Sequence, residues 1–163
     1  SGSTIEDNGK PSVQFVSLDS LSKTGLTDFV SGSFVYNFDS SQNNMITTEE
    51  GNTSNHYIFH SSSQVSFDGG VGTDDEARMS LNGASLTSYA ENQTGSYSIN
   101  NQYHLYFNYD ASRAMDSSFD TLGILTSGFD FSGKMQEIVV WTDDNSSNVS
   151  GIDTNINTHY SIY

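Results

Sequence analysis

The stretch that decides the fold is residues 131–163, which read FSGKMQEIVVW, then TDDNSSNVSG, then IDTNINTHYSIY. The first part predicts a β-strand, because Val139, Val140 and Trp141 are β-branched or aromatic and Gly133 precedes them. Apolar side chains occur at both alternating positions of this run, which indicates a strand covered on both faces. The polar residues 142–145 end the strand.

The end of the chain predicts one short amphipathic helix. Ser146 or Ser147 can supply the N-cap oxygen, and Asp153 lies in the early turns, where a negative charge is favourable. We expect the helix to dock on a sheet face or edge through its apolar stripe. The stripe has spacings of 3, 4, 4 and 3 and consists of Val149, Ile152, Ile156, Tyr160 and Tyr163.

Upstream of this unit, the chain predicts many short strands joined by turns. Ten Phe and nine Tyr stand among many Gly, Ser, Asn and Thr residues, a composition typical of short strands and unlike that of disordered chains. The dipeptide Asn82-Gly83 is the strongest hairpin signal, because both central residues of such a turn need positive φ. We expect strands at 11–16, 29–38, 45–48, 56–60, 64–68, 77–81, 84–86, 96–99, 102–109 and 119–125.

This pattern predicts an all-β fold: a two-sheet antiparallel jelly-roll sandwich with one short C-terminal helix. We expect a single domain over residues 1–163, with residues 1–10 loose. The chain has neither an initiator Met nor a signal peptide, so we expect a processed product or a fragment.

The charge of the chain excludes several classes of partner. The formal net charge is −15, with only five Lys plus Arg, so the surface repels nucleic acids and anionic membranes. It is compatible with a salty, marine medium, where ions screen self-repulsion. No apolar run approaches the roughly 20 residues of a membrane span, so we expect no membrane insertion. Cysteine is absent, which favours a microbial or viral source over a secreted eukaryotic one.

Motifs at both ends of the chain resemble one family. The first is F-x-G-x-x-Q-E-I-x-x-W, from Phe131 to Trp141, followed by a polar loop and by I-x-x-x-I-N-x-H-Y-x-I-Y from Ile152 to Tyr163. The second is N-G-K-P-S-V-Q-F, at residues 8–15. Together they resemble the laminin-G-like domains of the concanavalin A-like lectin/glucanase superfamily. The similarity is to a microbial and phage branch that looks like the lectin-like domain of α-L-arabinofuranosidase B.

The sequence departs from that family in three places. His159 replaces a usual aromatic residue, and the entry strand continues Phe15-Val16-Ser17 where the family has F-D-G. An N-terminal region with Y-D-Q-S-G-N, present in longer relatives, is absent. The resemblance spans nearly the whole chain, with specific motifs only at its ends.

The resemblance implies a non-catalytic lectin-like recognition or structural module on a virion or cell surface. Its expected partners are glycans or sibling subunits, which includes a homo-oligomer, and its expected location is extracellular or on a virion, as in a phage structural protein. Tyr and Trp supply stacking faces for sugars, and Asn and Asp supply hydrogen-bond partners. The carbohydrate-binding residues cannot be named from the sequence. The alternative is a glycoside hydrolase of the α-L-arabinofuranosidase type.

Glu137 is the first candidate for catalysis, and the sequence argues against it. Glycosidases need a second carboxylate at a set distance, whereas Glu137 has no acidic neighbour along its strand. Its neighbours on the same expected face, Met135 and Val139, are apolar. There is also no G-x-S-x-G motif and no Cys nucleophile. We therefore predict no catalytic residue and no enzyme activity.

An acidic glycine-containing loop is the candidate metal site. Calcium prefers several oxygen ligands in a bent loop, so Asp68, Asp74 and Asp75 are the predicted calcium ligands. Residues 142–145 form a rival loop, and a plain solvated turn is the alternative for both. His56 and His60 share a strand face but stand about 13 Å apart, too far for one zinc ion. Calcium is the only cofactor that we expect.

Overall fold

The computed structural model describes residues 5–16, 19, 21–22, 29–42, 44–48, 57–68, 77–109, 121–126 and 129–163. One sheet of five strands has the order β3 (Val13–Phe15), β15 (Gly133–Trp141), β5 (Ser31–Phe38), β11 (Gln102–Tyr109) and β9 (Ala77–Leu81). A sheet of six has the order β10 (Asn92–Thr94), β8 (Gln64–Asp68), β7 (Tyr57–His60), β6 (Asn44–Thr48), β12 (Thr121–Leu122) and β4 (Leu21–Ser22). Two small pairs join β1 (Glu6–Asp7) with β2 (Lys10–Pro11), and β13 (Ile124–Thr126) with β14 (Phe129–Asp130).

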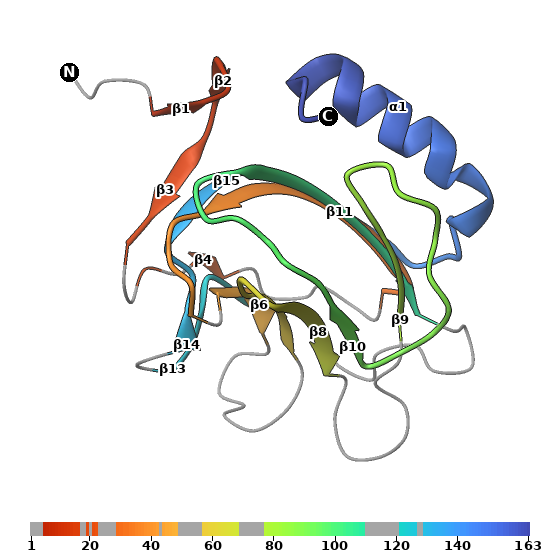
Figure 1. Ribbon diagram of the computed structural model, residues 1–163, viewed down its shortest axis with the longest axis horizontal. Helices are drawn as coiled ribbons and strands as arrows, with labels where there is room; N and C mark the ends of the chain where they lie inside the picture. The colour runs from red at the N-terminus through yellow and green to blue at the C-terminus, as the bar shows by residue number, and fades with distance from the viewer. Residues whose placement is uncertain are drawn as a thin grey trace.

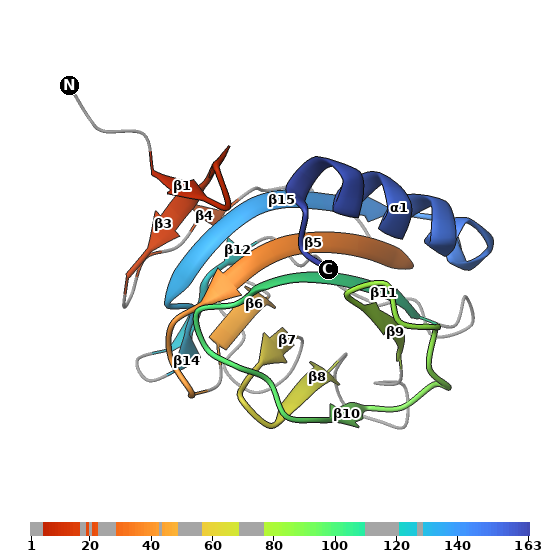
Figure 2. The same cartoon turned by 45° about the horizontal axis from the view of Figure 1, so that its top comes forward.

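The described part is thus mostly β, with all the strand pairs antiparallel. One helix of more than a single turn, α1 (Val149–Tyr160), follows the short 3-10 turn η2 (Ser146–Asn148). The prediction of an all-β fold with one short C-terminal helix is confirmed. Figures 1 and 2 show α1 over the outer face of β15, β5 and β11, with β6, β7 and β8 on the other side of that sheet.

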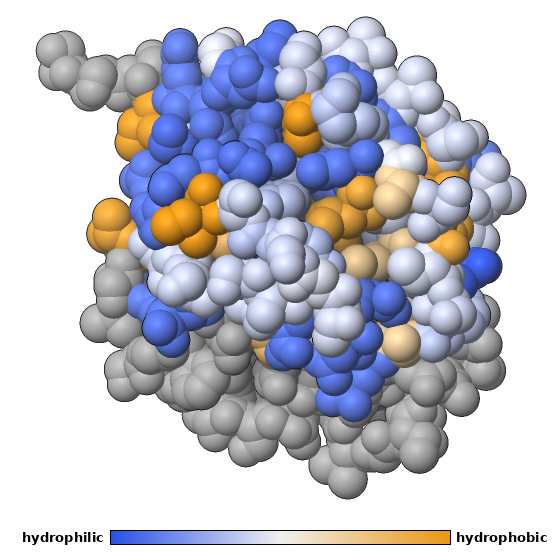
Figure 3. Space-filling model, viewed as in Figure 1, coloured by the Kyte–Doolittle hydropathy of each residue, from blue (hydrophilic) through white to orange (hydrophobic). Residues whose placement is uncertain are grey.

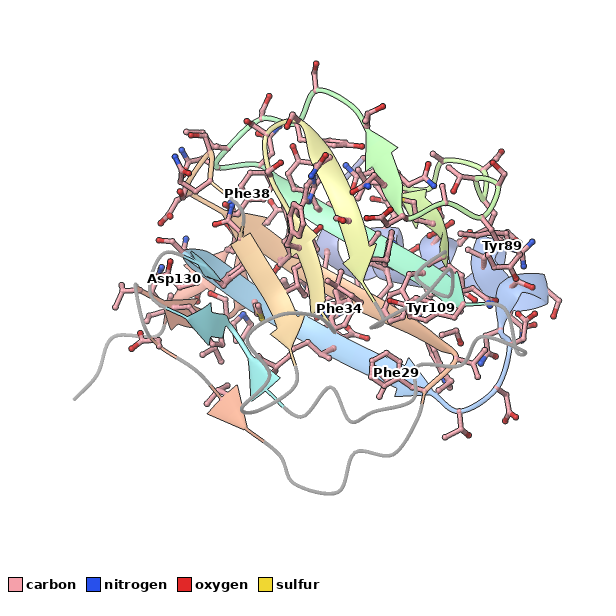
Figure 4. All side chains as sticks on the ribbon, turned by 90° about the horizontal axis from the view of Figure 1, so that it is seen from below. Phe29, Phe34, Phe38, Tyr89, Tyr109 and Asp130 are labelled. Carbon is pink, nitrogen blue, oxygen red and sulfur yellow. The ribbon has the colours of Figure 1, made fainter. Side chains whose placement is uncertain are left out.

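An aromatic core fills the space between the two large sheets. Phe34 of β5 and Phe107 of β11 stack with their ring centroids 5.4 Å apart. Alternation along each strand sends every second side chain to this inner face. Figure 4, seen from the side of the six-stranded sheet, labels four members of the core: Phe29, Phe34, Phe38 and Tyr109. The six-stranded sheet contributes Ile46, Ile58, Val65 and Phe67.

The outer face of the five-stranded sheet is covered by α1. Val35 of β5 is fully buried there with Ile156 and Tyr160, which are 4% and 7% exposed, and Ile152 packs beside them. The predicted docking of the helix through its apolar stripe is confirmed for these residues. Tyr163 lies beyond the helix and is half exposed. The strand β15 is covered less completely than its sequence indicates, because Met135 is buried but Ile138 is 37% exposed.

A bulge changes which residues of β15 share a face. The pairing of β15 with β5 shifts between Met135 and Glu137, so Gln136 is the extra residue. As a result Met135 packs in the inner core, while Glu137 pairs with Val35 on the face beneath the helix. The prediction that Met135 and Glu137 point the same way was wrong, because simple alternation assumes a strand without a bulge.

Glycines stand at two positions where the backbone requires them. Gly133 has φ of 147°, and a Cβ there would lie 2.0 Å from the carbonyl oxygen of Asn37. Asn82 and Gly83 have φ of 51° and 73°, as a type I′ turn needs. The turn is confirmed, but residues 84–86 that follow it form no strand.

Three other local predictions differ from the structure. The β1–β2 hairpin covers residues 6–11, although we expected residues 1–10 to be loose. Asn8 at its tip donates hydrogen bonds to the carbonyl oxygens of Tyr160 and Ser161. β10 occupies 92–94, while the expected strand at 96–99 is irregular. The N-cap of α1 is Asn148, because the two serines before it are taken into η2.

Candidate functional site

A chain of buried polar side chains lies between α1 and the five-stranded sheet. The Ser33 hydroxyl is 2.9 Å from Nε2 of His104, and Nδ1 of His104 is 3.1 Å from Oδ1 of Asp153. The Ser80 hydroxyl donates to Oδ2 of Asp153 at 3.0 Å. Ser33, His104 and Ser80 are at most 1% exposed, and Asp153 is 8% exposed. These contacts connect the helix to strands β5, β9 and β11.

Sheet register and helix periodicity bring these residues together. His104 pairs with Val35, and Ser80 pairs with Tyr106, so both strands present these side chains to the face under α1. Asp153 precedes Ile156 by three positions and therefore lies on the buried side of the helix. The helix thus brings a carboxylate, along with apolar residues, onto the sheet.

The contacts follow the order of a serine–histidine–aspartate triad, but the site is not built for nucleophilic attack. A catalytic serine must reach a substrate carbonyl beside an oxyanion hole. Ser33 is 1% exposed, and the groove that the described residues form nearby is lined by Asp153 but by neither Ser33 nor His104. We interpret these connected polar side chains as a structural link between α1 and the sheet, since buried polar groups need partners.

A surface groove of about 550 Å³ runs along the other side of Asp153. It lies between residues 149–158 of α1 and the turn after β9. Its size is within the range of small-ligand sites. The lining residues are Gly83, Ala84, Ser85, Leu86, Val149, Ser150, Asp153, Thr154, Asn157, Thr158 and Tyr163.

Tyr163 forms one wall of this groove. Its ring lies over Gly83, where a Cβ would come within 2.5 Å of the ring, and its hydroxyl donates to the backbone carbonyl of Asp153 at 3.1 Å. Partial burial, and then the charge of Asp153, raise the pKa of Tyr163 to about 12, so the phenol is neutral at physiological pH. Asn157 fixes the tail that carries the ring, since its Oδ1 accepts from the backbone amides of Ile162 and Tyr163.

Hydroxyl groups supply most of the groove's polarity. The Thr154 and Thr158 hydroxyls donate to the carbonyl oxygens of Ser150 and Thr154, both at 2.7 Å, which leaves their own oxygens able to accept. Ser85 and Ser150 are exposed. Figure 3 shows that the described residues on the face seen in Figure 1 are mostly hydrophilic, with hydrophobic residues in separate areas.

The structure places Glu137 away from this groove. It is partly buried under α1, and its Oε2 accepts a hydrogen bond of 2.9 Å from the Tyr160 hydroxyl. Burial, followed by this bond and the charge of Glu137, raises the pKa of Tyr160 to about 12. Glu137 therefore connects β15 to α1 through this hydrogen bond.

The predicted calcium ligands lie mostly outside the described residues. Asp74 and Asp75 are not described, and of Asp68 only the backbone, at the end of β8, is described. In the rival loop, Asp143 and Asp144 are exposed, and Asp144 accepts the amide of Ser146 at 2.7 Å. Among the described residues, no three His, Cys, Asp or Glu side chains gather as a metal site.

Of the histidines, His56 is not described, and His159 is exposed on α1. His104, on β11, joins the helix to the sheet. His60 is fully buried, with its Nδ1 2.6 Å from the Tyr36 hydroxyl. Burial lowers its pKa from 6.5 to about 3, so it is neutral at physiological pH.

Sequence reasoning missed His104, Asp153 and the serines that they contact. One available signal was Asp153, a charged residue directly beside the apolar stripe of the helix. His104 gave a second signal, because in the sequence it stands within the aromatic-rich run 103–109. Neither signal names the partner, since the contacts cross 49 to 73 positions of sequence.

Comparison with family models, with curated proteins and with solved structures finds no match. No helix in the described part of the chain is long and apolar enough to span a membrane.

Proposed function

We propose that the protein is a non-catalytic, lectin-like recognition module that binds glycans in the groove between α1 and the turn at Asn82-Gly83. The observation that carries this proposal is the half-exposed Tyr163 ring beside a row of hydroxyl groups and one carboxylate. Sugars present C–H faces that stack on aromatic rings and hydroxyls that pair with polar groups, so the groove offers both kinds of contact.

The finer fold assignment and the location belong to the same proposal. Two antiparallel sheets around one core, and the motifs at both ends of the chain, support a jelly-roll of the concanavalin A-like type. The net charge of −15 and the absence of cysteine support an extracellular or virion surface in a microbial or marine setting. Sibling subunits remain the second kind of partner, testable by the mass of the particle in solution.

The alternative of a glycoside hydrolase has less support. Glu137, the carboxylate of the resembling motif, is held under the helix by Tyr160. Asp153, the carboxylate in the groove, is held by Ser80 and lies against His104. Both are engaged with the protein, whereas hydrolysis needs two carboxylates that face one sugar bond.

The test is a glycan array followed by calorimetry with the glycans that bind. Ser150→Trp should fill the groove and weaken binding at least tenfold, while His159→Trp, on the same helix but outside the groove, should leave it unchanged. If the folded wild-type protein binds no glycan, or if both variants bind like the wild type, the proposal is wrong.

A further inference from the structure

The charge in the groove is one-sided. Among the described residues that line it, Asp153 is the only one with a charged side chain. The described basic residues are Lys10, Arg78 and Lys134, and none of them lines the groove. An anionic ligand would therefore meet a carboxylate with no cation among these lining residues to offset it, on a chain whose net charge is −15.

The carboxylate is held in place rather than free to move aside. Oδ2 of Asp153 accepts from Ser80, and Oδ1 lies 3.1 Å from His104. Its side chain is 11% exposed, so a small part of it reaches the groove surface. Repulsion between like charges is stronger near a partly buried group than in open water, because less solvent screens it.

The other walls suit a neutral sugar. The Thr154 and Thr158 hydroxyl oxygens can accept hydrogen bonds from sugar hydroxyls. The Tyr163 phenol stays neutral below its pKa of about 12 and already donates to the backbone of Asp153. The groove therefore offers acceptors and one aromatic ring, which match hydroxyls and C–H faces.

From these observations we infer that the groove selects neutral, hydroxyl-rich glycans and rejects their carboxylated or sulfated counterparts. This inference rests on the proposed function, because it concerns the ligand of the same groove. Its basis is the fixed carboxylate of Asp153 and the absence of a basic side chain among the described lining residues.

The experiment compares pairs that share one backbone and differ in charge: dextran with dextran sulfate, and methyl-esterified polygalacturonate with polygalacturonate. Calorimetry at low ionic strength should show at least tenfold weaker binding of the charged member of a pair whose neutral member binds. The difference should shrink in 1 M salt, where the Debye length is about 3 Å.

Two variants with the same added charge locate the effect. Ser150→Arg places a cation in the groove and should reduce the discrimination at least threefold. His159→Arg adds the same charge on the exposed side of α1 and should leave the discrimination as it is. If both variants lose discrimination between neutral and charged glycans to the same extent, the net charge of the protein explains the effect. The inference about the groove is then wrong.

The two proposals fail in different ways. If the neutral and charged members bind equally within threefold, the inference is wrong and the proposed function stands. If the charged member binds better, the inference is also wrong. If no member of either pair binds and the glycan array is empty, the proposed function fails, and the inference fails with it.

Discussion

Oδ1 of Asp153, on α1, lies 3.1 Å from Nδ1 of His104, on β11, and neither atom has a hydrogen-bond partner elsewhere in the described structure. The contact joins the only long helix of the described chain to β11, a strand that lies between β5 and β9 in the five-stranded sheet. Because both residues are buried, the helix cannot leave the sheet without exposing apolar residues and separating this pair.

Replacing Asp153 should lower the stability of the fold. Asp153→Ala removes the acceptor for Ser80 and the contact of His104, so the free energy of unfolding should fall by about 1–3 kcal/mol. Urea denaturation followed by circular dichroism measures the change. Asn155→Ala, an exposed position on the same helix, is the control. Equal losses in the two variants would show that the buried contact adds no stability.

Ile156→Ala should lower the stability of the fold more than Asp153→Ala does. The side chain is 4% exposed and packs against Val35, so its truncation should lower the free energy of unfolding by about 2–5 kcal/mol. Ile99→Ala, at a residue that is 42% exposed, is the matched control and should change it by less than about 1 kcal/mol. Similar chemical denaturation midpoints for both variants would contradict the observed docking of the helix.

Burial of His60 predicts a loss of stability in acid. The folded-state pKa is about 3, below the unfolded value of 6.5, so the unfolded chain binds more protons between these values. Stability is therefore lost as pH falls from about 6.5 towards 3, and His60 alone should account for about 2 kcal/mol between pH 7 and pH 5.

The measurement is the unfolding free energy at several pH values in His60→Gln, whose amide can still pair with the Tyr36 hydroxyl. This variant should have a shallower pH dependence than the wild type. His159→Gln, at an exposed histidine, should keep the wild-type dependence. The explanation is wrong if the two variants show the same slope.

Calcium binding by the loop of Asp68, Asp74 and Asp75 stays a prediction. An ion that binds only the folded state at 100 times its Kd adds about 2.7 kcal/mol to stability. The melting temperature should therefore rise with calcium relative to chelator at constant ionic strength. Asp74→Asn with Asp75→Asn should abolish the rise, and Asp143→Asn with Asp144→Asn should not. An unchanged wild-type melt excludes the site.

Glu137 should prove to be structural. Glu137→Gln keeps an oxygen that can accept from the Tyr160 hydroxyl, so the unfolding free energy should change by less than about 1 kcal/mol. The wild type should not hydrolyse aryl α-L-arabinofuranosides. Wild-type turnover that disappears in Glu137→Gln, with the fold intact, would make this residue catalytic.

Local pattern was enough to predict most of the strands and the helix. The strands 64–68, 77–81 and 102–109 have the predicted boundaries, and the helix buries Ile156 and Tyr160 as its spacing indicates. These features depend on side-chain alternation and on residue propensities, which act between residues close in sequence. The positive φ of Asn82 and Gly83 followed from local chemistry in the same way.

Other features depended on contacts between distant parts of the chain. The side-chain amide of Gln136, the extra residue of the bulge, donates hydrogen bonds to the backbone carbonyls of Asp7 and Lys10. The bulge therefore could not be deduced from the sequence of β15 alone. The N-terminal hairpin is ordered because Asn8 reaches the end of α1. A polar segment that appears loose by composition is fixed once distant carbonyl groups accept its hydrogen bonds.

The candidate site is also a feature that depends on contacts between distant parts of the chain. The sequence by itself determined an acidic all-β chain with a helix that has one apolar stripe, because composition and periodicity are properties of the chain. Only the tertiary structure decided that Asp153 meets His104 and that Tyr163 lies over Gly83 beside the groove. The reason is that sheet register and helix docking set these neighbours, and both are fixed by packing between segments far apart in the sequence.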